Sequence, residues 1–196
     1  MPVLIYMESA YRRADGTGVI RCEAMLPGDG QATISKVVRD TTARQLTREK
    51  LLLLAELLQN GVPDSNGERR KLRHVEILVY TTDQAFWDDL RIQADAEMTN
   101  SPQQSRNSDV CAQIIRQCRD NGCRLRNMGN SLLQKLVRSE AYRYLENQER
   151  ITRSGAPQQS TCMRLRQSIT KWLMRRCRNA SRPRLNPGLY PRLPWG

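Results

Sequence analysis

The sequence predicts an α/β domain in which a mixed five-stranded sheet is flanked by helices, followed by a basic C-terminal helix and a proline-rich tail. Three observations lead to this prediction. Turn signals at Asp15-Gly16 and at residues 27–30 (PGDG) divide residues 1–38 into three β-rich stretches. A leucine-rich helical pattern occupies residues 41–60, and helices and strands alternate after it. Hairpin-linked strands followed by such an alternation indicate a mixed sheet covered by helices.

The first three predicted strands cover residues 3–6, 19–26 and 32–38. Residues 3–6 form a short apolar run, and the segment 11–17 contains the first turn signal. Residues 19–26 alternate imperfectly between apolar and polar side chains. We expect the three strands to pair as an antiparallel meander.

The helix predicted over residues 41–60 has the strongest pattern in the chain. Thr41 or Thr42 can cap its start, and most of its residues are good helix formers. Residues 51–54 are four consecutive leucines, which indicates a helix buried on more than one side. Gly61 and Pro63 end it.

The rest of the domain alternates between strands and helices. Residues 75–80 (VEILVY) form the most apolar strand, which favours a central position in the sheet. The further predicted elements are a helix at 82–96, a helix at 108–120, a strand at 123–128 and a helix at 132–148. A chain of 196 residues has room for one domain and an appendage. We assign 1–150 to the domain, 151–160 to a linker, 161–180 to a basic amphipathic helix and 181–196 to an extended proline-rich tail.

Charge is distributed unevenly along the chain. The net charge is +12, from 32 basic and 20 acidic residues, and no acidic residue follows Glu149. Such a basic region favours a polyanionic partner, most simply nucleic acid, and arginine adds bidentate phosphate contacts and stacking on bases. The alternative is an arginine-rich genome composition with a solvated basic face. That alternative explains the many arginines, but it does not explain why the acidic residues stop at Glu149.

Cysteine and hydropathy patterns exclude several classes of protein. No CxxC spacing occurs and His74 is the only histidine, so we expect no zinc site. No apolar run approaches the ~18 residues of a spanning helix, and the N-terminus lacks the features of a signal peptide. We therefore expect a cytoplasmic protein without a membrane partner. We expect its cysteines to be reduced and mostly buried: Cys22, Cys111, Cys118, Cys123, Cys162 and Cys177.

Three short segments carry a resemblance to a known family. Residues 4–9 (LIYMES) form an apolar strand that ends in an acid, residues 41–42 are a Thr-Thr pair at a helix start, and residues 79–84 (VYTTDQ) end a strand. Together with the element order, they resemble the ribonuclease H-like superfamily, whose members carry sequence motifs such as IYTDGS and YSDSQ. The resemblance covers about residues 2–149. It implies the fold of that superfamily, nuclease-type chemistry on RNA or an RNA–DNA hybrid, and a phage or mobile-element origin.

The chemistry of this superfamily requires clustered carboxylates, which hold two Mg²⁺ ions at the scissile phosphate. Glu8 stands where members have their first Asp, and Thr82 stands where another Asp is expected, so that Asp83 falls one residue late. Glu49 also falls late on its helix, and Glu140 matches only by its distance from the fifth strand. The resemblance thus implies four degenerate catalytic candidates, with Glu8 and Asp83 as candidate metal ligands, and Mg²⁺ as cofactor only if the chain is active. The alternative for each is a solvated surface acid.

The predicted helix at 161–178 is amphipathic. Leu165, Ile169 and Trp172 face one way, while the basic residues fall on another stripe. This pattern predicts nucleic-acid contacts, which we extend to the two arginines that begin the tail: Arg164, Lys171, Arg175, Arg178, Arg182 and Arg184. The alternatives are a solvated outer face, a membrane-surface helix and a calmodulin-like target. In the tail, Tyr190 and Trp195 could anchor a protein partner or stack on bases, or the tail could simply be disordered.

Three functions remain open from the sequence. The first is a nucleic-acid-binding protein with weak or absent nuclease activity, working as a subunit of a nucleoprotein assembly. The second is an active Mg²⁺-dependent endoribonuclease of the ribonuclease H type. The third is an interaction protein whose basic region meets an acidic protein partner.

Overall fold

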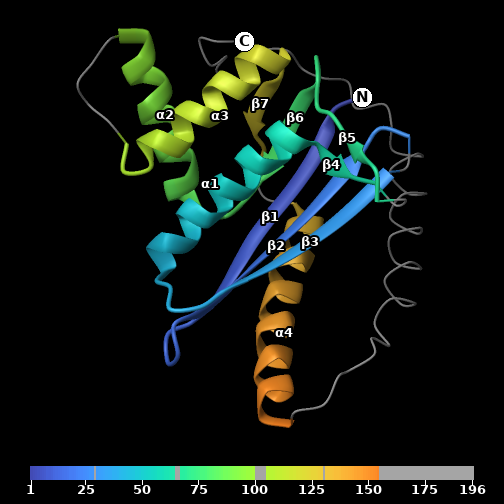
Figure 1. Ribbon diagram of the computed structural model, residues 1–196, viewed down its shortest axis with the longest axis vertical. Helices are drawn as coiled ribbons and strands as arrows, with labels where there is room; N and C mark the ends of the chain where they lie inside the picture. The colour runs from blue at the N-terminus through green and yellow to red at the C-terminus, as the bar shows by residue number, and fades with distance from the viewer. Residues whose placement is uncertain (29, 65–66, 100–104, 130, 155–196) are drawn as a thin grey trace. The chain divides into compact units, whose positions relative to one another are not determined.

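The computed structural model describes residues 1–28, 30–64, 67–99, 105–129 and 131–154 (Figure 1). Met1–Arg150 form one compact unit and Ile151–Gly196 a second, of which only residues 151–154 are described. The predicted basic helix and proline-rich tail lie outside the described residues, so both stay predictions.

One mixed sheet organises the first unit. Its strands follow the order β3-β2-β1-β6-β7, with β1–β2 and β2–β3 antiparallel and β1–β6 and β6–β7 parallel. The strands are β1 (Val3–Arg12), β2 (Thr17–Leu26), β3 (Gly30–Val38), β6 (Glu76–Tyr80) and β7 (Arg124–Asn127). The predicted antiparallel meander and the mixed five-stranded sheet are confirmed. The middle place belongs to β1, and the more apolar β6 lies between β1 and β7.

Helices cover both faces of this sheet. The helices are α1 (Ala43–Asn60), α2 (Gln84–Thr99), α3 (Ser108–Asn121) and α4 (Leu132–Ser154). Ile5 and Met7 of β1 join the main core with residues of α1, α2 and α3, whereas Ala10 joins a smaller core with Ala141 and Leu145 of α4. Because side chains alternate along a strand, α4 lies on the face opposite α1. Among the described residues, no helix combines the length and apolar character needed to cross a membrane.

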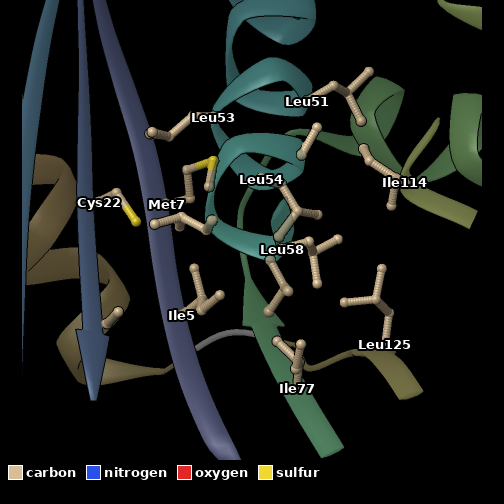
Figure 2. Close-up of a cluster of buried hydrophobic side chains, with 14 of the residues drawn as sticks. Ile5, Met7, Cys22, Leu51, Leu53, Leu54, Leu58, Ile77, Ile114 and Leu125 are labelled. Carbon is tan, nitrogen blue, oxygen red and sulfur yellow. The ribbon is translucent and has the colours of Figure 1, made fainter. Parts of the chain in front are cut away.

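Helix α1 packs across the sheet as its leucine run predicts. Thr42 caps its start through a capping box with Gln45, and Gly61, with a φ of 89°, ends it. Its leucines Leu51, Leu53, Leu54 and Leu58 point among side chains from the strands and α3 (Figure 2). Burial of this run on several sides confirms the expectation drawn from four consecutive leucines.

Most boundaries differ from the prediction by one to three residues, and three larger differences stand out. Strand β1 continues to Arg12, beyond the predicted end at residue 6. The prediction stopped early because Glu8 interrupts the apolar run, but Glu8 keeps the alternation of the strand and lies on the α4 face of the sheet. The loop predicted after α1 contains a small hairpin of β4 (Val62–Pro63) and β5 (Arg69–Arg70), too short to leave a periodic signal. Helix α4 continues to Ser154, into the start of the predicted linker.

The cysteines of the described residues are free thiols. Cys22, Cys111, Cys118 and Cys123 are all buried, as predicted, while Cys162 and Cys177 lie outside the described residues. Burial raises the pKa of Cys22, Cys111 and Cys118 to about 12, so these thiols are protonated near neutral pH.

Candidate active site

Glu8 is the most deeply buried of the candidate acids. Its residue exposure is 1%, and it lies on the α4 face of β1. Its Oε1 accepts hydrogen bonds from the backbone N–H of Thr82 (2.7 Å) and from Nε2 of Gln134 (2.8 Å), and its Oε2 accepts one from Oγ1 of Thr82 (2.8 Å). We call Glu8, Thr82 and Gln134 the Glu8 cage. Its three hydrogen bonds satisfy a buried carboxylate, which would otherwise be costly to remove from water.

The sheet register brings Thr82 to Glu8. Strand β6 runs parallel to β1 with Tyr80 opposite Tyr6, so the residue two places beyond Tyr80 meets the residue two places beyond Tyr6. The bonds from Thr82 to Glu8 follow from this register. Thr82 itself is exposed, so the Glu8 cage lies directly beneath the surface.

The start of α4 orients Gln134. The N–H of Gln134 donates to Oγ of Ser131 (3.1 Å), and the N–H of Ser131 donates back to Oε1 of Gln134 (3.2 Å). This reciprocal pair is a capping box. Because the cap engages the amide oxygen, Gln134 presents its NH₂ group to Glu8. The cap therefore fixes a hydrogen-bond donor, and not a metal ligand, beside the carboxylate.

Asp83 faces a different helix. Its Oδ2 accepts from Nζ of Lys50 and from Oγ1 of Thr47, both at 2.9 Å, and its Oδ1 accepts from the N–H of Phe86 (3.3 Å) at the start of α2. The Lys50 side chain is 3% exposed and that of Asp83 is 16% exposed. Burial acts to raise the pKa of Asp83, but the Lys50 ammonium and these hydrogen bonds outweigh it and lower the pKa below its usual value. Lys50 thus supplies the positive charge that this carboxylate needs.

The other two candidates form ion pairs on opposite faces of the sheet. Glu49 of α1 pairs with Lys36 of β3 at 2.6 Å, and Glu140 of α4 pairs with Arg21 of β2 at 3.1 Å. Arg21 also donates to Oγ of Ser35 at 2.5 Å. The structure therefore brings Glu8 to Thr82 and Gln134, and gives the other three candidate acids a basic partner each. In the part of the chain that the structure describes, no group of three or more His, Cys, Asp or Glu residues is placed to hold a metal ion.

The residues around Glu8 do not fit a magnesium site. Mg²⁺ demands near-octahedral oxygen ligands and is usually held by one or two carboxylates with several waters. Here Glu8 is the only acid of the cage, its oxygens already accept three hydrogen bonds, and Gln134 offers N–H groups. Around Asp83, the ammonium of Lys50 already stands where a cation would bind.

Sequence reasoning missed Gln134 and Lys50. The signal for Gln134 was the Ser131-x-x-Gln134 spacing ahead of a helix, which is typical of a capping box. The signal for Lys50 was a lysine next to four leucines in a helix expected to be buried on several sides, since a buried lysine needs an acidic partner. Neither pattern indicates which carboxylate the side chain meets.

The predicted nucleic-acid contacts lie outside the described residues: Arg164, Lys171, Arg175, Arg178, Arg182 and Arg184. Within the described part, four exposed arginines lie on α3 and β7: Arg116, Arg119, Arg124 and Arg126. Arg119 forms an ion pair with Glu97 (3.5 Å) and Arg126 with Glu76 (2.7 Å). Such exposed pairs are weak and leave the arginines able to reach a phosphate.

No protein-family model matches the chain, and no curated protein matches it. Among solved structures, the ribonuclease H1 LC11, isolated from compost by a metagenomic approach, is 16% identical, with 74% of this chain and 97% of that chain covered and a TM-score of 0.47. The same enzyme in complex with an RNA/DNA hybrid is 16% identical, with 71% of this chain and 92% of that chain covered and a TM-score of 0.47. The N-terminal ribonuclease H domain of a Mycobacterium tuberculosis protein, fused to maltose-binding protein, is 10% identical, with 72% of this chain and 95% of that chain covered and a TM-score of 0.44. Because these TM-scores are below 0.5, the description of the fold rests on the strand order of the chain itself.

Proposed function

We propose that this chain binds nucleic acid without cleaving it, as a ribonuclease H-like domain that serves as a binding subunit of a nucleoprotein assembly. The Glu8 cage is the observation that supports the absence of cleavage. Two-metal phosphodiester cleavage needs several carboxylates whose oxygens converge on the same ions. In this chain the oxygens of Glu8 accept hydrogen bonds from a threonine and a glutamine, and Asp83 is neutralised by Lys50.

The charge distribution supports nucleic-acid binding. The chain carries a net charge of +12, and no acidic residue follows Glu149. The basic residues of that segment, with no acidic residue among them, attract a phosphate backbone. RNA or an RNA–DNA hybrid is the partner we favour, from the resemblance of the sequence.

A hydrolysis assay tests the absence of cleavage. We expect the full chain to leave an RNA–DNA hybrid and single-stranded RNA intact in Mg²⁺ or Mn²⁺. The matched variants are Glu8→Gln, which keeps the size of the side chain, and Asp83→Asn. Metal-dependent cleavage by the natural chain that disappears in Glu8→Gln would overturn the proposal in favour of an active nuclease.

A salt titration of binding tests the basic region in the intact chain. A variant with Arg164, Lys171, Arg175 and Arg178 changed to Ala should bind more weakly, because counterion release scales with the number of phosphates contacted. The logarithmic slope should flatten by about 0.7 per lost contact on single strands and about 0.9 on duplex, hence by two units or more in total.

A comparison variant changes four arginines of the described part to Ala: Arg116, Arg119, Arg124 and Arg126. We expect a smaller change of slope in this comparison variant than in the first. The opposite ranking would move the main phosphate contacts onto α3 and β7. No binding by the natural chain at low salt would remove nucleic acid as the partner and favour an acidic protein instead.

A further inference from the structure

Within the residues that the structure describes, one end of the α4 face of the sheet is only partly covered. Helix α4 packs over Ala10 and Val19, which are 1% and 0% exposed. At the other end of the same face, Leu4, Leu78 and Tyr80 are only half-buried. Their strand neighbours on the opposite face, such as Ile5 and Val79, are 0% exposed. An apolar surface that remains open on one face of a sheet indicates a binding surface.

Register lines up the residues of this open end. Met25, Leu4, Leu78 and Arg126 stand side by side on β2, β1, β6 and β7, because Leu4 is paired with both Met25 and Leu78, and Leu78 with Arg126. In the next row the rings of Tyr6 and Tyr80 stack, with centroids 4.5 Å apart and planes 17° from parallel. Tyr6 and its register partner Glu23 are buried, at 6% and 4% exposure, so Tyr80 is the ring of this row that the open end presents. The open end therefore combines aliphatic side chains, one half-buried aromatic ring and a basic rim.

The rim is formed by arginines of the edge strand β7. Arg124 and Arg126 are both exposed, and their partners in register, Glu76 and Leu78, place them on the same face as Tyr80. Glu76 pairs with Arg126 at 2.7 Å, so this acid neutralises part of the rim. The net charge of the two arginines and Glu76 is still positive, which complements a phosphate backbone.

We propose that this open end of the sheet, formed by Leu4, Met25, Leu78 and Tyr80, stacks the bases of single-stranded nucleic acid while Arg124 and Arg126 hold its phosphates. The inference rests on the proposed function and adds a second contact to it, on the folded domain. Sheet faces that present aromatic side chains beside basic residues bind unpaired bases, because every base has a face that can stack. A duplex keeps its bases stacked on one another and gains nothing from such a surface.

The test compares binding of a labelled oligouridylate of about 12 nucleotides, a length in the range that single-strand-binding domains cover, with an RNA duplex. In the full chain, Tyr80→Ala should weaken single-strand binding about 5- to 150-fold, leave its salt slope unchanged and leave duplex binding unchanged. Tyr80→Phe should bind like the natural chain, since it keeps the ring. Tyr142→Ala, which removes an exposed tyrosine of α4, is the matched control and should have no effect.

Changing Arg124 and Arg126 together to Ala should flatten the single-strand slope by about 1.4, the value for two phosphates. If Tyr80→Ala lowers the thermal stability, Tyr80→Leu replaces it, because leucine keeps apolar volume and lacks the ring. If Tyr80→Ala and Tyr80→Leu both bind the single strand as tightly as the natural chain does, the inference is overturned and the proposed function still stands. An equal loss on single strand and duplex would also overturn it. Absence of binding by every variant and by the natural chain would overturn both.

Discussion

Lys50→Met is expected to lower the free energy of unfolding by about 3 kcal/mol, near the lower end of the range for breaking a buried ion pair. The reason is that Asp83, whose side chain is 16% exposed, would keep its charge without the ammonium now 2.9 Å away. Methionine has a similar length and helix propensity, so the helix itself should be unaffected. Urea denaturation at neutral pH measures the change.

Two control variants separate charge from packing. Lys50→Met with Asp83→Leu should recover most of the loss, because removing both partners leaves no unpaired buried charge. Lys36→Met breaks the more exposed pair with Glu49 and should cost less than about 1 kcal/mol. Equal losses in Lys50→Met and Lys36→Met would show that the buried pair has no special weight.

The same pair should make the stability depend on acidity. The pKa of Asp83 is lowered in the folded state, so its contribution is fully present above the unfolded value of about 3.9 and is lost as the pH falls through the folded value. The difference between the natural chain and Lys50→Met should therefore shrink below about pH 4.

Thr82→Asp is expected to make the stability of the protein depend on divalent cations. Without metal, the substitution removes the hydrogen bond of 2.8 Å from the Thr82 hydroxyl to Glu8 and places a second carboxylate beside that buried acid. The free energy of unfolding should therefore fall by about 2–4 kcal/mol. Two adjacent carboxylates beneath an exposed position can share a Mg²⁺ ion, and a ligand that binds only the folded state raises the melting temperature. The melting temperature of Thr82→Asp should therefore rise with Mg²⁺.

The natural chain and Thr82→Asn are the controls for this variant. Asparagine has the size of aspartate without its charge, so neither control should respond to Mg²⁺. A natural chain stabilised by Mg²⁺ as strongly as Thr82→Asp would mean that the oxygens of Glu8 are open to a metal. That result would count against the absence of cleavage that we propose.

Most of the fold was predictable because its signals are local. Asp15-Gly16 and the sequence at 27–30 mark turns, and the pattern at 41–60 gives the helix with its cap at Thr42. The apolar sequence of β6 predicted its interior place between two strands, but it did not predict that β1 occupies the exact middle of the sheet. Strand order depends on pairing between distant segments, which hydropathy alone does not encode.

The site was predictable only to the level of candidate acids. Glu8 and Asp83 follow apolar stretches, and that position was enough to single them out. Their partners Gln134 and Lys50 come from elements that are distant in sequence, and a hydrogen bond across the fold leaves no periodic signal. The structure adds that the acids are held by these partners and not by one another.

The central place of β1 has a consequence for synthesis on the ribosome. One edge of β1 pairs with β2, which emerges next, but the other edge must wait for β6, because Tyr6 pairs with Tyr80. At about 5–20 residues per second, the roughly 70 residues between them take on the order of ten seconds. During that interval a nascent β-meander carries an unpaired edge with Val3 and Ile5, a surface that invites association with other chains. The topology therefore makes the interval before β6 emerges the period in which this edge is most open to association.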